Sequence, residues 1–199
     1  MIENIIKAAI LNKHIYPEFR NRPELVIQSL GTVAIAAFSS AIYLHYKGTV
    51  INPESDFARL QMMAVAFSTI FVGMMMWSFI NNTLCGLLGG EAEFRETIRS
   101  TGIAYGPGVG LIFATIPLIG DYILLASLIW LLATVTNGVK VTHNISLAKA
   151  IIPSVIGWFM SWILLPWLMI IGPISQIPWL TKIQAHTFQR HPIEKKEDF

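Results

Sequence analysis

The acidic and basic residues that follow the second long apolar run are the clearest candidates for chemistry in this sequence. Five of them fall in one short stretch: Glu91, Glu93, Arg95, Glu96 and Arg99. On a helix, Glu91 would pair with Arg95 at i,i+4 spacing, and Glu96 would pair with Arg99 at i,i+3 spacing. Two readings stay open, namely a solvated, self-paired surface helix at the cytoplasmic face and a docking site for a protein partner.

Signatures of catalysis or cofactor binding are missing from the sequence. There is no G-x-x-x-x-G-K-[ST] phosphate loop, no H-E-x-x-H zinc pair and no G-x-S-x-G nucleophile elbow. The five histidines are scattered, and the single cysteine, Cys85, lies in an apolar stretch. Asp121 falls in a predicted turn on the side of the membrane opposite the Glu91 cluster, so the two cannot meet. We therefore expect no enzyme activity, no cofactor and no metal.

The overall composition is that of a membrane protein. Hydrophobic residues make up 54% of the 199 positions, charged residues make up 13%, and the mean hydropathy is +0.57. Globular proteins carry about 25% charged residues, and disordered chains are more polar still. A nucleic-acid-binding protein needs a dense basic surface, whereas the formal net charge here is +2.

Charge-free runs locate the expected membrane spans, because a charge at mid-bilayer costs roughly 2.5–3.5 kcal/mol on insertion scales. A helix needs about 20 residues to cross about 30 Å of hydrocarbon. The sequence predicts an all-α, polytopic protein with five transmembrane helices: 25–46, 60–80, 102–119, 121–139 and 148–171.

Two of the apolar runs are longer than one span. Leu84–Gly90, after the polar residues that close the second span, is assigned to a helical extension at the interface. Pro166 lies inside the last run and predicts a kink, because proline lacks the backbone donor and its ring collides with the preceding turn. The Gly172-Pro173 pair is expected to end that span.

Short interfacial segments are expected at both ends of the chain. Apolar side chains recur at helical spacing within residues 1–24, at Ile2, Ile5, Ile6 and Ala9. That pattern is typical of an amphipathic helix lying on a membrane surface. Residues 172–199 are read as a second interfacial segment followed by a polar tail, which either crosses the membrane or lies flat on it.

Glycines and prolines distinguish the third span. Gly102, Gly106 and Gly110 are spaced four apart, as two overlapping G-x-x-x-G units on one helical face. Glycine allows a neighbouring backbone to approach closely, which favours helix association in lipid. This face could serve packing within one monomer, a homodimer seam or a flexible gating element. Pro107 and Pro117 are predicted to bend or break the same stretch.

Basic residues favour a cytoplasmic N-terminus. Lysine and arginine are frequent before the first span, at Lys7, Lys13, Arg20 and Arg22. Leaving out the distal tail, the side that carries the N-terminus has more of them than the other side, and cytoplasmic loops are the basic ones. The basic tail is the exception to this pattern.

Several short motifs occur in an order and spacing found in one family. They are Leu87–Glu91 with Phe94, Arg95, Thr97 and Ile98; Tyr105-Gly106-Pro107 with Pro117-x-x-Gly120; and Trp130, Gly138-Val139-Lys140 and residues 146–150. Together these resemble the Yip domain of the Ypt/Rab-interacting membrane proteins, over about residues 5–172. The short first segment, with Leu11-Asn12 and Phe19, resembles the small prokaryotic members.

The resemblance implies a five-span helical bundle with its N-terminus in the cytoplasm, in a prokaryotic cytoplasmic membrane or an internal membrane. Eukaryotic members engage small GTPases and shape or sort vesicle membranes. Their long N-terminal region and their Asp-Leu-Tyr-Gly-Pro signature do not occur here, and Tyr105-Gly106-Pro107 is only a partial match. Binding of a small GTPase is therefore not carried over to this chain.

The leading functional hypothesis is a non-enzymatic membrane adaptor, or an accessory subunit of a larger membrane complex. Its expected partners are membrane lipids together with other membrane proteins or further copies of the chain. The alternative is a small transporter, channel or lipid scramblase, because broken helices expose backbone groups to a substrate. Few polar residues would support transport: Asn81, Asn82, Thr83, Thr115 and Thr134.

Overall fold

The computed structural model describes residues 1–51 and 56–171, and all regular structure within these ranges is helical. Residues 1–165 form one compact unit, which ends before Pro166. The predicted interfacial segment and tail at 172–199 lie outside the described residues. The helices up to Leu87 are α1 (Ile2–Ala9), α2 (Ile15–Asn21), the 3-10 turn η1 (Pro23–Leu25), α3 (Val26–Ile51) and α4 (Asp56–Leu87).

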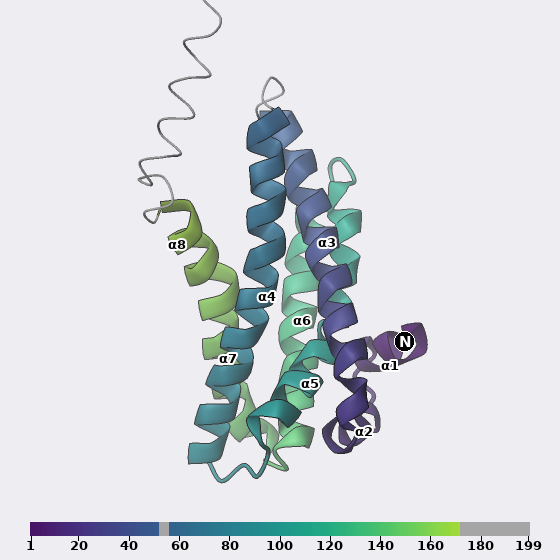
Figure 1. Ribbon diagram of the computed structural model, residues 1–199, viewed down its shortest axis with the longest axis vertical. Coiled ribbons are helices and arrows are strands. Elements are labelled where there is room, and N and C mark those ends of the chain that lie inside the picture. Colours follow the sequence, from purple (N-terminus) through teal and green to yellow (C-terminus); the bar gives the residue numbers. More distant parts are fainter. Residues whose placement is uncertain (52–55, 172–199) are drawn as a thin grey trace, which may run out of the picture. The chain divides into compact units, whose positions relative to one another are not determined.

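The later helices change winding twice. They are α5 (Phe94–Ala104), the 3-10 helix η2 (Gly106–Thr115), α6 (Gly120–Thr142), α7 (Leu147–Phe159), the π-helical turn η3 (Met160–Leu164) and α8 (Leu165–Ile171). Figure 1 shows α3, α4 and α6 as long neighbouring helices, with the short α1 and α2 beside them.

Within the described ranges, four helical stretches are long and apolar enough to cross a membrane. They are Pro23–Lys47, Leu60–Leu87, Gly120–Thr142 and Leu147–Leu168. These correspond to the first, second, fourth and fifth predicted spans. The second continues to Leu87, so part of the expected interfacial extension is a direct continuation of α4.

The third predicted span is where structure and expectation differ. The span was predicted at residues 102–119, with Pro107 and Pro117 bending or breaking it, whereas the α-helix begins earlier, at Phe94, and ends at Ala104. The chain then continues as the ten-residue 3-10 helix η2, although 3-10 runs longer than 3–4 residues are uncommon. The physical reason lies in Pro107, which lacks an N–H, and in the glycines around it, which form α-helix poorly.

Two ion pairs mark opposite ends of the helical bundle. At one end, here called the Glu96 end, Arg20 at the end of α2 pairs with Glu96 in the first turn of α5. At the other, called the Asp121 end, Lys47 of α3 pairs with Asp121 in the first turn of α6. The α5–η2 segment begins at the Glu96 end and leads to Gly120, so it follows the length of the bundle (Figure 1).

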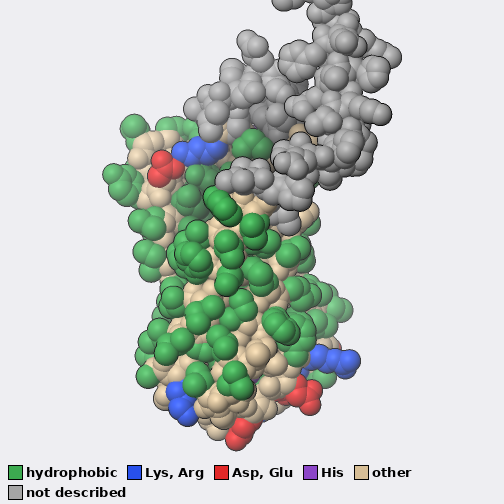
Figure 2. All heavy atoms as spheres, turned by 90° about the vertical axis from the view of Figure 1, so that its left-hand side faces the viewer, with side chains coloured by type: hydrophobic (Ala, Val, Ile, Leu, Met, Phe, Trp, Pro, Cys, Tyr) green, Lys and Arg blue, Asp and Glu red, His purple; other side chains and the backbone are tan. Residues whose placement is uncertain are grey.

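The distribution of side chains is that of a protein in lipid, with apolar groups outside and small polar groups inside. Ile27, Phe79 and Phe113 are among many large apolar side chains that are exposed. Figure 2 shows such side chains over the middle of one face, with charged side chains toward its ends. Inside, Ser29 donates a hydrogen bond to the Arg99 carbonyl at 2.7 Å. Hydrogen bonds of this kind join helices where lipid provides no hydrophobic drive.

Candidate functional site

The charged stretch at residues 91–99 folds differently from the self-paired helix that spacing suggested. The α-helix begins only at Phe94, so Glu91 precedes it and cannot form an i,i+4 pair with Arg95. Glu93 is the N-cap: its amide donates to the Glu96 carboxylate at 3.0 Å, and its own carboxylate accepts from the third helical residue. This reciprocal capping box satisfies amides that a helix start leaves unpaired.

Glu96 and Arg99 connect α5 to the N-terminal segment of the same chain. Glu96 accepts a hydrogen bond from the Arg20 side chain at 3.2 Å instead of pairing with Arg99. Arg99 is buried and donates through Nε to the Phe19 carbonyl at 2.7 Å, and through a second nitrogen to the Arg20 carbonyl. Carbonyls in the last turn of a helix lack partners and attract cations, so Arg99 caps α2.

Glu91 and Arg95 remain on the surface at the Glu96 end. Both are exposed, and neither side chain makes an ion pair with any residue that the structure describes. Of the five charged residues predicted for partner docking, these two are therefore available, whereas the other three stabilise the fold.

A buried histidine joins the ends of three helices beside this surface. His143 follows α6, and its Nε2 lies 2.9 Å from the Thr97 hydroxyl of α5. Thr97 in turn donates to the Asn82 side chain of α4 at 3.1 Å or to the Glu93 carbonyl at 3.1 Å. When the Thr97 proton is donated to either of these acceptors, the hydroxyl accepts from a neutral imidazole that carries its proton on Nε2.

The surroundings keep His143 neutral. Its pKa is lowered to about 4: burial is the largest cause, the Arg20 guanidinium adds to the lowering, and Glu96 opposes both with a smaller effect. A neutral ring matches these surroundings, in which Nε2 has one partner, the Thr97 hydroxyl, and Nδ1 has none among the described residues.

The three glycines of the third predicted span do not share one helical face. A Cβ atom on Gly102 would lie 2.8 Å from the Ser29 Cβ of α3. One on Gly106 would lie 2.9 Å from the Ile5 carbonyl of α1, and one on Gly110 would lie 3.5 Å from the Ser127 hydroxyl of α6. The break after Ala104 turns the glycines toward three different helices.

The break between α5 and η2 is buried and specifically bonded. The Ala104 carbonyl accepts a hydrogen bond from the Thr134 hydroxyl of α6 at 2.8 Å. The ring of Tyr105, the residue at the break, lies 6.0 Å from the Trp77 ring and 6.4 Å from the Trp162 ring, measured between centroids. A backbone interrupted inside a membrane protein needs such partners, because lipid supplies none.

The prolines predicted to bend the chain lie at changes of backbone winding. Pro107 is the second residue of η2, and Pro117 lies in the turn between η2 and α6, where Leu118 has a φ of 69°. Gly120 closes this turn, because a side chain there would collide with the Ala114 carbonyl. Pro166 is the second residue of α8, directly after the π-helical turn η3.

The C-terminal end of α1 and the residues just after it are bound to α6, because two of their backbone carbonyls accept hydrogen bonds from α6 side chains. Trp130 of α6 donates to the Ala9 carbonyl at 2.7 Å, and Asn137 donates to the Leu11 carbonyl at 3.2 Å. Ile2 and Ile6 face outward and are 72% and 55% exposed, so α1 keeps an apolar stripe toward its surroundings.

The contacts of Arg20, His143 and Trp130 were not predicted from the sequence, although each residue joins elements far apart in the chain. Arg20 had been counted only as a positive charge, and His143 only as one of several scattered histidines. Arg20 and His143 lie just outside predicted spans, which was a signal for polar contacts at the membrane boundary, whereas Trp130 lies inside the predicted span 121–139. Their partners could not be inferred, because those partners lie in distant segments.

No three His, Cys, Asp or Glu side chains gather into a metal site in the part of the chain that the structure describes. Cys85 is buried and free. Most polar contacts at the Glu96 end therefore hold one segment of the chain against another. The charged side chains that stay exposed there, without an ion pair among the described residues, are Glu91 and Arg95.

The chain is a multi-pass integral membrane protein. Its long helices are apolar, its exposed surface carries large apolar side chains, and polar side chains in its interior form hydrogen bonds between helices. The sequence matches the Yip1 domain over residues 13–170. The match covers more than half of the chain, so this protein belongs to the Yip1 domain family. No curated protein and no solved structure matches the chain.

Proposed function

We propose that the α5–η2 segment is a fifth, discontinuous membrane crossing. By helix geometry α5 rises about 16 Å and η2 about 20 Å, which together exceed the roughly 30 Å of a bilayer core. The ion pairs at both ends support this reading, because the segment connects them. With the basic N-terminal segment at the Glu96 end, we place that end in the cytoplasm.

We further propose that the protein is a non-enzymatic membrane adaptor, or an accessory subunit that binds another membrane protein. The observation that carries this proposal is the exposed pair Glu91 and Arg95 at the start of a rigidly capped helix. Glu96 and Arg99 hold that helix against α2, so the pair is presented on a fixed scaffold. Pre-organisation of this kind reduces the entropy lost on binding.

The test is gentle solubilisation from the native membrane, followed by identification of whatever co-migrates at stoichiometric level. The double variant Glu91→Ala/Arg95→Ala is expected to lose the partner without loss of folding. A matched control is Glu18→Ala/Arg22→Ala, which removes an exposed ion pair on neighbouring α2. Isolation of a homo-oligomer with lipid alone, or equal losses in both variants, would contradict the adaptor proposal.

One observation favours the alternative of transport or lipid scrambling. Asn81 in α4 is fully buried, and neither its amide nitrogen nor its amide oxygen has a hydrogen-bond partner among the described residues. Inside a membrane protein, such a polar group is costly and often belongs to a substrate path. Flux or lipid flipping in proteoliposomes that is lost in Asn81→Leu, but kept in the neighbouring Asn82→Leu, would establish this function.

A further inference from the structure

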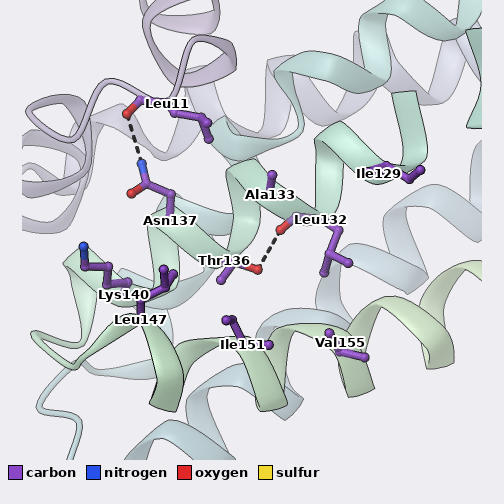
Figure 3. Close-up of a pocket in the computed structure, with 10 residues that line it drawn as sticks. All are labelled: Leu11, Ile129, Leu132, Ala133, Thr136, Asn137, Lys140, Leu147, Ile151 and Val155. Carbon is purple, nitrogen blue, oxygen red and sulfur yellow. Dashed lines mark hydrogen bonds between the residues drawn. The ribbon is translucent and has the colours of Figure 1, made fainter. Parts of the chain in front are cut away.

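A groove between α6 and α7 is open to the surroundings along the side of the bundle. Its volume is about 470 Å³, which is within the range of small-molecule sites. Ile129 and Ala133 of α6, Ile151 and Val155 of α7, and Leu11 all line it, and Figure 3 shows Leu132 of α6 on the side of α7. The walls are mostly apolar, and Ile129 and Ile151 are 57% and 43% exposed.

The groove is polar at one end only. Lys140 and Asn137 lie toward the Glu96 end, where α6 finishes, and Ile129 and Val155 lie at the other end of the groove (Figure 3). From Ile129 to Lys140 the helix rises about 16 Å, at about 1.5 Å per residue. That distance is close to half of a bilayer core of about 30 Å, which is the depth of one leaflet.

Lys140 supplies a positive charge that the described part of the chain does not neutralise. It makes no ion pair or side-chain hydrogen bond there, whereas Lys47 and Lys149 at the bundle ends both bind neighbouring elements. Thr136 and Asn137 are already committed, since they donate to the Leu132 carbonyl at 2.7 Å and to the Leu11 carbonyl at 3.2 Å. An anion at the mouth of the groove would thus meet Lys140 first.

We propose that this groove binds one anionic phospholipid of the surrounding membrane. The phosphate lies at Lys140, and one acyl chain follows the apolar walls toward Ile129 and Val155. Three properties of the groove fit this occupant. Its length is close to the depth of one leaflet, its walls are apolar like an acyl chain, and Lys140 supplies a positive charge at the end where the headgroup would lie. Because Leu11 forms part of the wall, the bound lipid also contacts the N-terminal segment. The proposal is independent of the adaptor function.

The test is native mass spectrometry of the full-length protein in mild detergent, with phosphatidylglycerol or phosphatidylcholine of identical acyl chains added. The wild-type protein is expected to retain one phosphatidylglycerol in preference to phosphatidylcholine. Lys140→Ala should weaken phosphatidylglycerol retention about five-fold, since one cation near a membrane surface contributes on the order of 1 kcal/mol. Lys140→Arg should preserve it.

Two further variants separate a built site from a charged surface. Arg95→Ala removes an exposed cation at the same end of the bundle and should leave retention unchanged. Ala133→Trp fills the groove from an exposed position and should lower the retention of both lipids. Thermal denaturation of each variant shows whether it is folded. Equal retention of the two lipids by the wild type, or equal losses in Lys140→Ala and Arg95→Ala, would overturn the proposal.

Discussion

The two halves of the α5–η2 segment are held in different ways. The α5 half starts in a capping box, carries the Glu96–Arg20 pair and buries Arg99 against two carbonyls of α2. The η2 half has no side-chain cap and leads to a turn in which Leu118 is 97% exposed. Directional polar contacts therefore fix the first half, whereas close packing positions most of the second. We expect substitutions to be most damaging in α5.

The largest effect is expected for Arg99→Met, which keeps much of the side-chain volume but leaves one buried and one partly buried carbonyl without this donor. Each unpaired carbonyl costs about 1–3 kcal/mol, so the total is about 4 kcal/mol. For a chain of this size that corresponds to a fall in Tm on the order of 10 °C, measured by thermal denaturation in detergent. Arg95→Met, at an exposed position, is the control. Equal Tm values for the two variants would show that Arg99 does not anchor α2.

A smaller loss is expected for Gly102→Leu. The added side chain meets both the side chain and the backbone of Ser29 in α3, and overpacking of this kind costs about 1–3 kcal/mol. Gly110→Leu is the matched control in the η2 half, where the nearest atom lies at ordinary van der Waals distance. The comparison uses Tm and the fraction that remains monodisperse in size-exclusion chromatography. A larger effect at Gly110 would reverse the proposed ranking of the two halves.

The His143 network predicts a dependence of stability on pH. The folded-state pKa of about 4 is below the ordinary value of 6.5, so the unfolded chain binds a proton first as the pH falls. The stabilisation is complete above about pH 6.5 and is lost progressively between 6.5 and 4. Between pH 7 and pH 6 the expected loss is less than about 1 kcal/mol.

Thermal denaturation of wild type and His143→Gln across this pH range provides the measurement. The glutamine amide can still donate to Thr97 but does not titrate, so its Tm should depend less steeply on pH. Parallel curves for the two proteins would assign the pH dependence to other groups.

The smallest effect is expected at the Asp121 end. Lys47 and Asp121 lie 2.7 Å apart, but their side chains are 33% and 74% exposed, whereas those of Arg20 and Glu96 are 27% and 22% exposed. Exposed pairs contribute little and are screened by salt. Lys47→Ala should therefore lower Tm less than Arg20→Ala does, with any difference from wild type disappearing at high salt. A larger effect at Lys47 would mean that the turn after η2 depends on this pair.

Sequence reasoning recovered the features that hydropathy determines. The family and the four long apolar helices followed from charge-free runs and motif order. The start of α5 at Phe94 was not predicted. The rule that ends a span at a charged residue excludes Arg99, yet Arg99 is buried and donates to a backbone carbonyl of α2. That partner cannot be identified from the sequence.

Gly102, Gly106 and Gly110 do not share the predicted helical face, and the reason is geometric. An α-helix has 3.6 residues per turn and a 3-10 helix has 3.0, so positions four apart lose their alignment once the winding changes at Tyr105. Pro107 indicated that the helix would be interrupted. Nothing local indicated that the interruption would continue as ten residues of 3-10 helix, since that outcome depends on the packing of η2 against other helices.

The 3-10 winding of η2 also has a consequence for membrane thickness. Its ten residues extend about 20 Å, whereas ten residues of α-helix would extend about 15 Å. The difference of about 5 Å is similar to the variation in hydrocarbon thickness among cellular membranes. A segment that is short in residues can therefore match a thick bilayer without stretching the lipid around it. Under the proposed fifth crossing, replacing this winding by an α-helix would shift the bundle's hydrophobic match toward thinner membranes.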